Sequence, residues 1–236
     1  MPLILRVDVD KPFGHSNLIR KISSKVFEDI IGTPPLKFYK YLSHLIEFLE
    51  YCNSEKISGF IYHRICTSPN KKVTDLLIDG KHKFGLHAEN TKSYETFLSE
   101  FHDLKKRNPK LIIESFTKHG SGQLKLGKYH YPIYEPAKYR EWSKKANIKY
   151  HSGNGIAQNT NDLLCKNDEF DNVFWLEREY RNEDLFEIEK IIELAKTEKV
   201  VVLIHPCNYH SFKVVKDDFQ NLVNLSKKEK VDWIVY

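Results

Sequence analysis

The chain has 236 residues, of which 41% are hydrophobic, 29% charged and 13% aromatic, and this composition excludes a disordered, collagen-like or coiled-coil protein. The net charge of +5 suits an anionic substrate, but without a long basic run it does not indicate a nucleic-acid partner. No apolar run approaches the roughly 20 residues that a membrane span needs, and two aspartates interrupt the short apolar start. We therefore expect a cytoplasmic globular protein, and four cysteines without CxxC spacing agree with a reducing compartment.

Apolar runs of strand length alternate with amphipathic segments of helical period along the chain. In chain order we predict a strand over residues 3–9, a helix over 36–51, strands over 57–65 and 83–86, a helix over 93–106, a strand over 111–117, a helix over 136–145, strands over 148–151 and 173–176, a helix over 184–196, a strand over 200–204 and a helix over 217–226. Residues 232–236 could add a last strand.

This alternation of strands and helices is typical of parallel strands joined by crossover helices. About seven or eight such units, with no repeat and no Gly/Ser linker, predict one domain over residues 1–236. The predicted fold class is α/β, a distorted (β/α)7-type barrel with parallel strands. A doubly wound open sheet is the alternative, but its glycine-rich phosphate loop is missing, since neither GxGxxG nor GxxxxGK[ST] occurs.

Polar side chains end most of the predicted strands. The first strand ends in two aspartates, the sixth in Glu177 and Arg178, and five of the eleven histidines fall at the ends of other strands. These histidines are His63, His87, His119, His151 and His205. Because the carboxyl ends of parallel strands form one rim, we expect these side chains to converge there. Carboxylates and imidazoles bind zinc-type ions and carry protons, so the rim is predicted to hold a divalent metal ion, with zinc as the first choice, or an acid–base pair.

The two aspartates carry the strongest part of this signal. Asp8 and Asp10 are two residues apart on a strand, so both side chains point to the same face, where two like charges are costly unless a cation or a shared proton relieves them. A lone histidine at a strand end is more often structural, but the placement of His87 and His205 favours function. His63 and His151 stay open between the two interpretations.

Three features suit substrate binding. In the sequence TKHGSG over residues 117–122, the glycines around Ser121 let the backbone approach an anion, and Lys118 adds positive charge, although an ordinary turn is the alternative. Arg178 could hold a carboxylate or phosphate bidentately, or could begin a salt-bridged helix. The aromatic run over residues 129–134 could line a groove for a sugar ring or pack as a loop.

Three short motifs resemble the polysaccharide deacetylase (NodB-homology, carbohydrate esterase family four) superfamily. They are RVDVD over residues 6–10, FGLHAENT over 84–91 and VVLIHP over 201–206. The resemblance implies a distorted (β/α)7 barrel in which Asp8 is the base, Asp10 and His87 bind a divalent metal and His205 is the general acid. Thr91 stands where the family has a second metal-binding histidine, and we infer that His119 supplies the missing ligand. The chain looks like a divergent branch found in bacterial surface-polysaccharide (O-antigen or capsule) biosynthesis.

The leading functional prediction is a metal-assisted hydrolase of an N-acyl (amide) bond on a sugar or polysaccharide, with no nucleic-acid partner and no membrane span. Substrate-orienting roles are expected for Lys118, Ser121, Glu89 and Arg178. Because Thr91 replaces a ligand, a metal-independent enzyme that modifies a polysaccharide terminus, for instance by amide formation, is the second hypothesis. A non-catalytic carbohydrate-binding module is the third.

Overall fold

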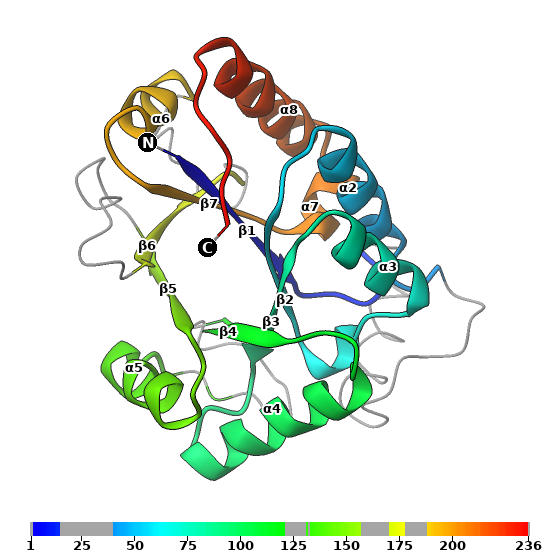
Figure 1. The fold of residues 1–236 in the computed structure, drawn as a ribbon, viewed down its shortest axis with the longest axis vertical. Coiled ribbons are helices and arrows are strands. Elements are labelled where there is room, and N and C mark those ends of the chain that lie inside the picture. The colour runs from blue at the N-terminus through cyan, green and yellow to red at the C-terminus, as the bar shows by residue number, and fades with distance from the viewer. Residues whose placement is uncertain are drawn as a thin grey trace.

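Seven parallel strands pair in chain order and close into a barrel (Figure 1). The computed structural model describes residues 2–14, 40–120, 131, 133–156, 170–177 and 188–235. The strands are β1 (Leu3–Val9), β2 (Gly59–His63), β3 (Lys83–Ala88), β4 (Ile113–Lys118), β5 (Tyr150–Ile156), β6 (Phe170–Trp175) and β7 (Val200–Ile204). The last strand, β7, pairs with β1 and closes the ring, and register shifts in β3 and β5 distort it. The predicted α/β (β/α)7-type barrel is confirmed.

Helices surround the barrel on its outer side (Figure 1). They are α2 (Ser43–Ser54), α3 (Lys71–Asp79), α4 (Tyr94–Arg107), α5 (Pro136–Lys145), α6 (Ile188–Ala195), α7 (Pro206–Ser211) and α8 (Lys213–Lys228), with the short 3-10 turn η2 (Ile65–Thr67). Sequence patterns did not predict α3 and α7. In the described parts of the chain, no helix has the length and apolarity that crossing a bilayer requires.

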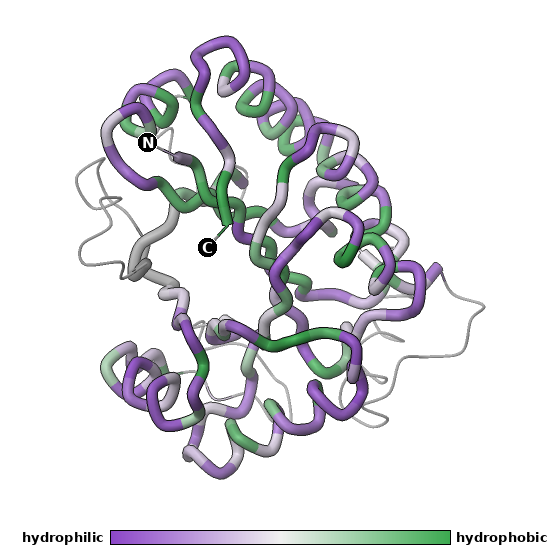
Figure 2. The backbone as a smooth tube through the Cα atoms, in the orientation of Figure 1, coloured by the Kyte–Doolittle hydropathy of each residue, from purple (hydrophilic) through white to green (hydrophobic). Residues whose placement is uncertain are grey.

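Alternation along the strands separates two apolar clusters. Residues such as Leu5 and Val7 of β1 point outward and join the large core between the strands and the helices. Inward residues form a smaller cluster inside the ring. Its members are Ile4, Phe60, Tyr62, Val201 and Leu203. Figure 2 shows hydrophobic residues concentrated along β1 and β7 and on part of the helical surface.

The amino end of the barrel is closed by the last described residues of the chain. The backbone N–H of Leu3 donates to the carbonyl of Asp232, and the N–H of Ile234 donates to the carbonyl of Leu3. Ile234 and Val235 pack against the inner cluster. The predicted last strand over residues 232–236 is therefore only an isolated bridge at Trp233. Apolar side chains thus occupy the amino end of the barrel, and the predicted polar site residues lie at the carboxyl ends of the strands.

Candidate metal and acid–base site

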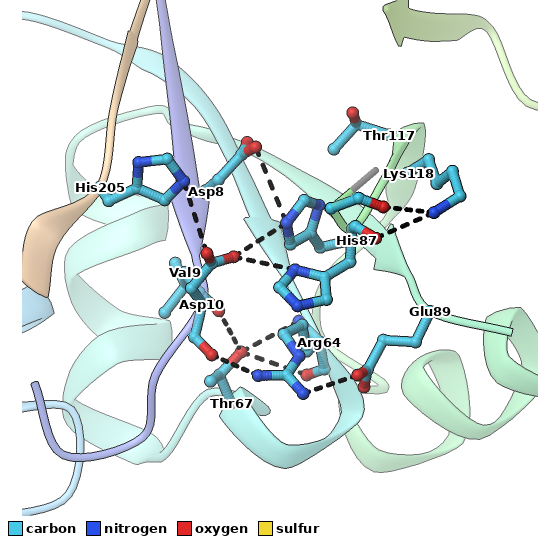
Figure 3. A network of polar contacts seen from close by, with 12 residues as sticks. Asp8, Val9, Asp10, Arg64, Thr67, His87, Glu89, Thr117, Lys118 and His205 are labelled. Atoms are coloured by element: carbon cyan, nitrogen blue, oxygen red, sulfur yellow. Dashed lines mark hydrogen bonds and ion pairs between the residues drawn. The ribbon is translucent and has the colours of Figure 1, made fainter. Parts of the chain in front are cut away.

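The carboxyl ends of β1, β3, β4 and β7 bring five predicted site residues into one cluster (Figure 3). Asp8 lies on β1 and Asp10 directly follows its end, while His87 lies near the end of β3. His119 directly follows β4, and His205 directly follows β7. The local cause is the inward face of β1, which carries Ile4, Arg6 and Asp8 in turn toward the rim.

Asp10 and two imidazoles form a group that can hold a metal ion. The Nε2 atom of His87 and the Nδ1 atom of His119 each lie 3.0 Å from Oδ1 of Asp10. One ligand atom from each of the three residues lies within 4.8 Å of the others. Three protein ligands of the nitrogen and oxygen type match the donor sets of catalytic zinc sites.

The charge states of this group also suit a cation. Burial lowers the pKa of His119 to about 3, so its imidazole is neutral at pH 7 and has a lone pair to share. Burial would raise the pKa of Asp10, but the imidazoles of His119 and His205 hold it well below its usual value. Asp10 is therefore a carboxylate, and the donor set fits a divalent ion.

Asp8 is held by a residue that sequence reasoning missed. Nε of Arg6 donates to Oδ1 of Asp8 at 2.9 Å, and Nη2 donates to Oδ2 at 2.7 Å. The same guanidinium donates to Thr117, Ser152 and the carbonyl of Gly153. Burial would raise the pKa of Asp8, but the charge of Arg6 lowers it overall. Strand alternation could have found this pair, because Arg6 precedes Asp8 by two residues and shares its face.

His205 is paired with Glu177. Nδ1 of His205 lies 2.7 Å from Oε2 of Glu177, and its backbone N–H donates to Oε1 at 2.5 Å. Its Nε2 atom lies 3.5 Å from Oδ2 of Asp10. Burial alone would lower the pKa of His205, but the Glu177 carboxylate raises it to about 9. His205 therefore carries a proton at pH 7. Sequence reasoning placed Glu177 at a strand end but did not pair it with His205.

The two histidines left open by the sequence lie outside this cluster. His63 points outward from β2, where its Nδ1 lies 2.6 Å from the carbonyl of Thr67. His151 packs against the rings of Phe116 and Tyr139, with centroid distances of 5.0 and 5.5 Å. Burial lowers the pKa of His63 to about 4 and that of His151 to about 3. Both imidazoles are therefore neutral at pH 7, His63 fully buried and His151 partly buried against aromatic rings.

The residues predicted to orient substrate are placed differently from one another. Glu89 lies at the edge of the cluster, with its carboxylate 2.6 Å from Nη2 of Arg64. Lys118 is fully buried, and its ammonium donates to the carbonyls of His119 and Gly120 (Figure 3). It thus holds the backbone that follows β4. Ser121 and Arg178 lie outside the described residues.

Thr91, at the position of the expected second histidine, has a different task. It is fully buried, and its hydroxyl lies 3.2 Å from the hydroxyl of Tyr139 on α5. The Tyr139 hydroxyl in turn donates to the carbonyl of Ile133 at 2.9 Å. Thr91 therefore supports the segment that precedes α5, while His119 completes the cluster around Asp10.

Comparison with solved structures finds the same fold in proteins of very different sequence. A structure named as that of a probable polysaccharide deacetylase from Pseudomonas aeruginosa PAO1 matches 99% of this chain and 87% of its own, with a TM-score of 0.53 and 11% identity. Puue allantoinase matches 99% of this chain and 86% of its own, with a TM-score of 0.54 and 11% identity. A 4-alpha-glucanotransferase from Thermococcus litoralis matches 99% of this chain at 10% identity and a TM-score of 0.54, over 37% of its own length.

At these identities the likeness is one of fold. No protein-family model and no curated protein matches the chain. The chemistry must therefore be argued from the residues of the cluster itself.

Proposed function

We propose that the protein is a metal-assisted hydrolase that cleaves an N-acyl bond of a sugar or polysaccharide. The observation that carries the proposal is the group Asp10, His87 and His119, which lies between an ionised Asp8 and a protonated His205. The fold shared with a polysaccharide deacetylase supports the substrate class. We further propose that the reaction belongs to bacterial surface-polysaccharide biosynthesis in the cytoplasm.

Asp10, His87 and His119 would hold the divalent ion, with zinc as the first choice because two imidazoles and a carboxylate suit it. When bound, such an ion polarises the scissile carbonyl and lowers the pKa of a water molecule. The remaining steps belong to the side chains around this group.

Asp8 and His205 divide the proton transfers between them. The Asp8 carboxylate, ionised and held by Arg6, would take the proton of the attacking water. His205 would donate its Nε2 proton to the leaving amine as the carbon–nitrogen bond breaks, while Glu177 holds its Nδ1 side. The pKa of Asp8 is lowered and that of His205 is raised, so at one pH Asp8 can accept a proton while His205 can donate one.

Glu89, Ser121 and Arg178 are proposed to orient the substrate at the rim of this cluster. Lys118 would act through the carbonyls of His119 and Gly120. An anionic sugar would fit the arginine and the exposed amides that we expect in the loop around Ser121.

Metal binding and turnover together test the proposal. The chain is stripped with a chelator, titrated with Zn²⁺ by calorimetry, and assayed for acetate release from an N-acetylglucosamine oligosaccharide. We expect one ion per chain, and at least 100-fold weaker binding in Asp10→Asn, His87→Gln and His119→Gln. His102→Gln, an exposed histidine on α4, is the matched control and keeps full affinity.

Three results would contradict parts of the proposal. Full turnover after exhaustive chelation would favour the metal-independent enzyme. Glycan binding without product would favour the carbohydrate-binding module. Unchanged zinc affinity in His119→Gln would remove His119 from the ligand set.

A further inference from the structure

Arg64, directly after β2, links the two segments that carry Asp10 and His87. Its Nη1 donates to the backbone carbonyl of Asp10 at 2.5 Å, and its Nη2 donates to Oε1 of Glu89 at 2.6 Å (Figure 3). Glu89 follows His87 by two residues. One planar guanidinium, with a side chain only 8% exposed, therefore spans the ends of β1 and β3.

Arg64 is itself held in place by the turn that follows it. Its backbone N–H donates to the hydroxyl of Thr67 at 2.9 Å, and this hydroxyl donates to the carbonyl of Val9 at 2.9 Å. The turn η2 is thus fastened to the last residue of β1. Because the backbone of Arg64 is held in this way, its guanidinium can reach only a limited range of positions.

The other end of the link is fixed by α4. The carboxyl group of Glu100 accepts the backbone N–H of Glu89 at 2.9 Å and that of Asn90 at 3.2 Å. The segment after His87 is therefore held from two sides, by Arg64 through the side chain of Glu89 and by Glu100 through the backbone.

This link touches the backbone of Asp10 and leaves its carboxylate free for other contacts. Both carboxylate oxygens point to imidazoles, those of His87 and His119 at one oxygen and that of His205 at the other. A lone guanidinium so close would repel a metal ion, but Glu89 balances its charge. The pair can therefore orient the ligands without adding net charge to the site.

We propose that the Arg64–Glu89 ion pair is a positioning device that sets the separation of Asp10 and His87 and so preorganises the metal site. The inference rests on the proposed function, because it concerns the ion that this function requires. Outer partners of metal ligands typically contribute 10–100-fold to metal affinity. A buried ion pair contributes little net stability by itself, so a role in geometry is the better account of its presence.

The test compares Arg64→Met and Glu89→Gln with the wild-type chain. Zn²⁺ affinity is measured by competition with a chelating dye, and the visible absorption spectrum of bound Co²⁺ reports the ligand geometry. We expect each single variant to bind Zn²⁺ 10–100-fold more weakly than the wild type and to show an altered Co²⁺ spectrum. The double variant should bind Zn²⁺ no more weakly than the weaker-binding single variant, because both changes break the same ion pair. Glu89→Gln keeps the shape and one acceptor, so it remains informative if Arg64→Met does not fold.

Arg107→Met is the matched control, since Arg107 also pairs with a carboxylate, that of Asp103, but does so on the surface of α4. It should leave affinity and spectrum unchanged. If the wild-type chain binds Zn²⁺, and Arg64→Met or Glu89→Gln binds it equally tightly with the same Co²⁺ spectrum, this inference is wrong while the proposed function stands. A wild-type chain that binds neither ion would overturn the proposed function and this inference with it.

Discussion

Replacing Arg6 with methionine should cost about 3–5 kcal/mol of unfolding free energy, because it leaves the carboxylate of Asp8 buried without its cation. The side chains of Arg6 and Asp8 are 1% and 4% exposed, so water cannot take over the lost contact. The guanidinium also donates to Thr117, Ser152 and Gly153, and those acceptors lose a buried donor. Arg6 therefore holds Asp8 in place and links β1 to β4 and β5.

A double-mutant cycle measures this pair directly. Asp8→Asn alone should cost about 1.5–3 kcal/mol, since hydrogen bonds to charged groups are lost. The double variant Arg6→Met/Asp8→Asn removes both charges and should cost clearly less than the two single changes together. Unfolding free energies come from urea titrations of the metal-free protein at pH 7, followed by circular dichroism.

A half-exposed ion pair provides the control for that cycle. Lys83 and Glu114 are 2.9 Å apart with side chains 30% and 23% exposed, so Lys83→Met should cost less than about 1 kcal/mol. If the Arg6 and Asp8 effects add to within about 0.5 kcal/mol, the two side chains do not interact in the folded protein and the reasoning is refuted.

Three further changes address the site and the core. Thr91→His should lower the unfolding free energy by about 1–3 kcal/mol, because the larger imidazole must fit a buried position and the hydrogen bond to Tyr139 is lost. Zn²⁺ affinity should stay unchanged, and tighter binding would show that position 91 faces the metal site. Glu177→Gln should lower kcat about 100-fold with unchanged Zn²⁺ affinity, because the pKa of His205 falls without the Glu177 carboxylate and less of the general acid is then protonated. An unchanged kcat in steady-state kinetics would contradict this. Burial lowers the pKa of His63 to about 4, against about 6.5 for an unperturbed histidine, so the unfolded chain takes up this proton first and about 3 kcal/mol of stability is lost as the pH falls from 6.5 to 4. Urea titrations against pH should show a shallower loss in His63→Gln, and an identical slope would contradict the assignment.

The strands could be predicted because their apolar runs are short, rich in β-branched residues and closely bounded. The predicted ranges 3–9 and 200–204 coincide with β1 and β7. The helix α3 was missed although Asn70 caps it by accepting the N–H of Val73, because its nine residues carry only a brief amphipathic pattern. The helix α7 has six residues and follows β7 without a connecting loop, so no periodicity can develop.

The position of polar residues at strand ends predicted the cluster. Whether each side chain points into the barrel or toward the helices determined which of these residues belong to it. His87 and His63 both lie at the carboxyl ends of neighbouring strands. His63 stands in register with Val9, which faces the helices, whereas His87 stands in register with Thr117, which faces the interior beside Arg6. A shift of one residue in a strand reverses this facing, and sequence patterns do not fix register so closely.

The partners of the cluster depend on contacts between distant segments, which local patterns do not encode. Arg64 is 54 residues from Asp10, and Glu177 is 28 residues from His205. Arg6 is the exception, since it neighbours Asp8 on one face of the same strand. The residues that hold the reactive groups were therefore harder to predict than the reactive groups themselves.

Charge pairing around the rim singles out Asp10. Three carboxylates of this region each have a dedicated cationic partner. The pairs are Arg6 with Asp8, Arg64 with Glu89, and His205 with Glu177. Asp10 instead directs its oxygens at three imidazoles, of which His119 is neutral and His205 is already engaged by Glu177. Because a partly buried carboxylate is costly without a compensating cation, a divalent ion between Asp10, His87 and His119 would complete this pattern among the residues that the structure describes.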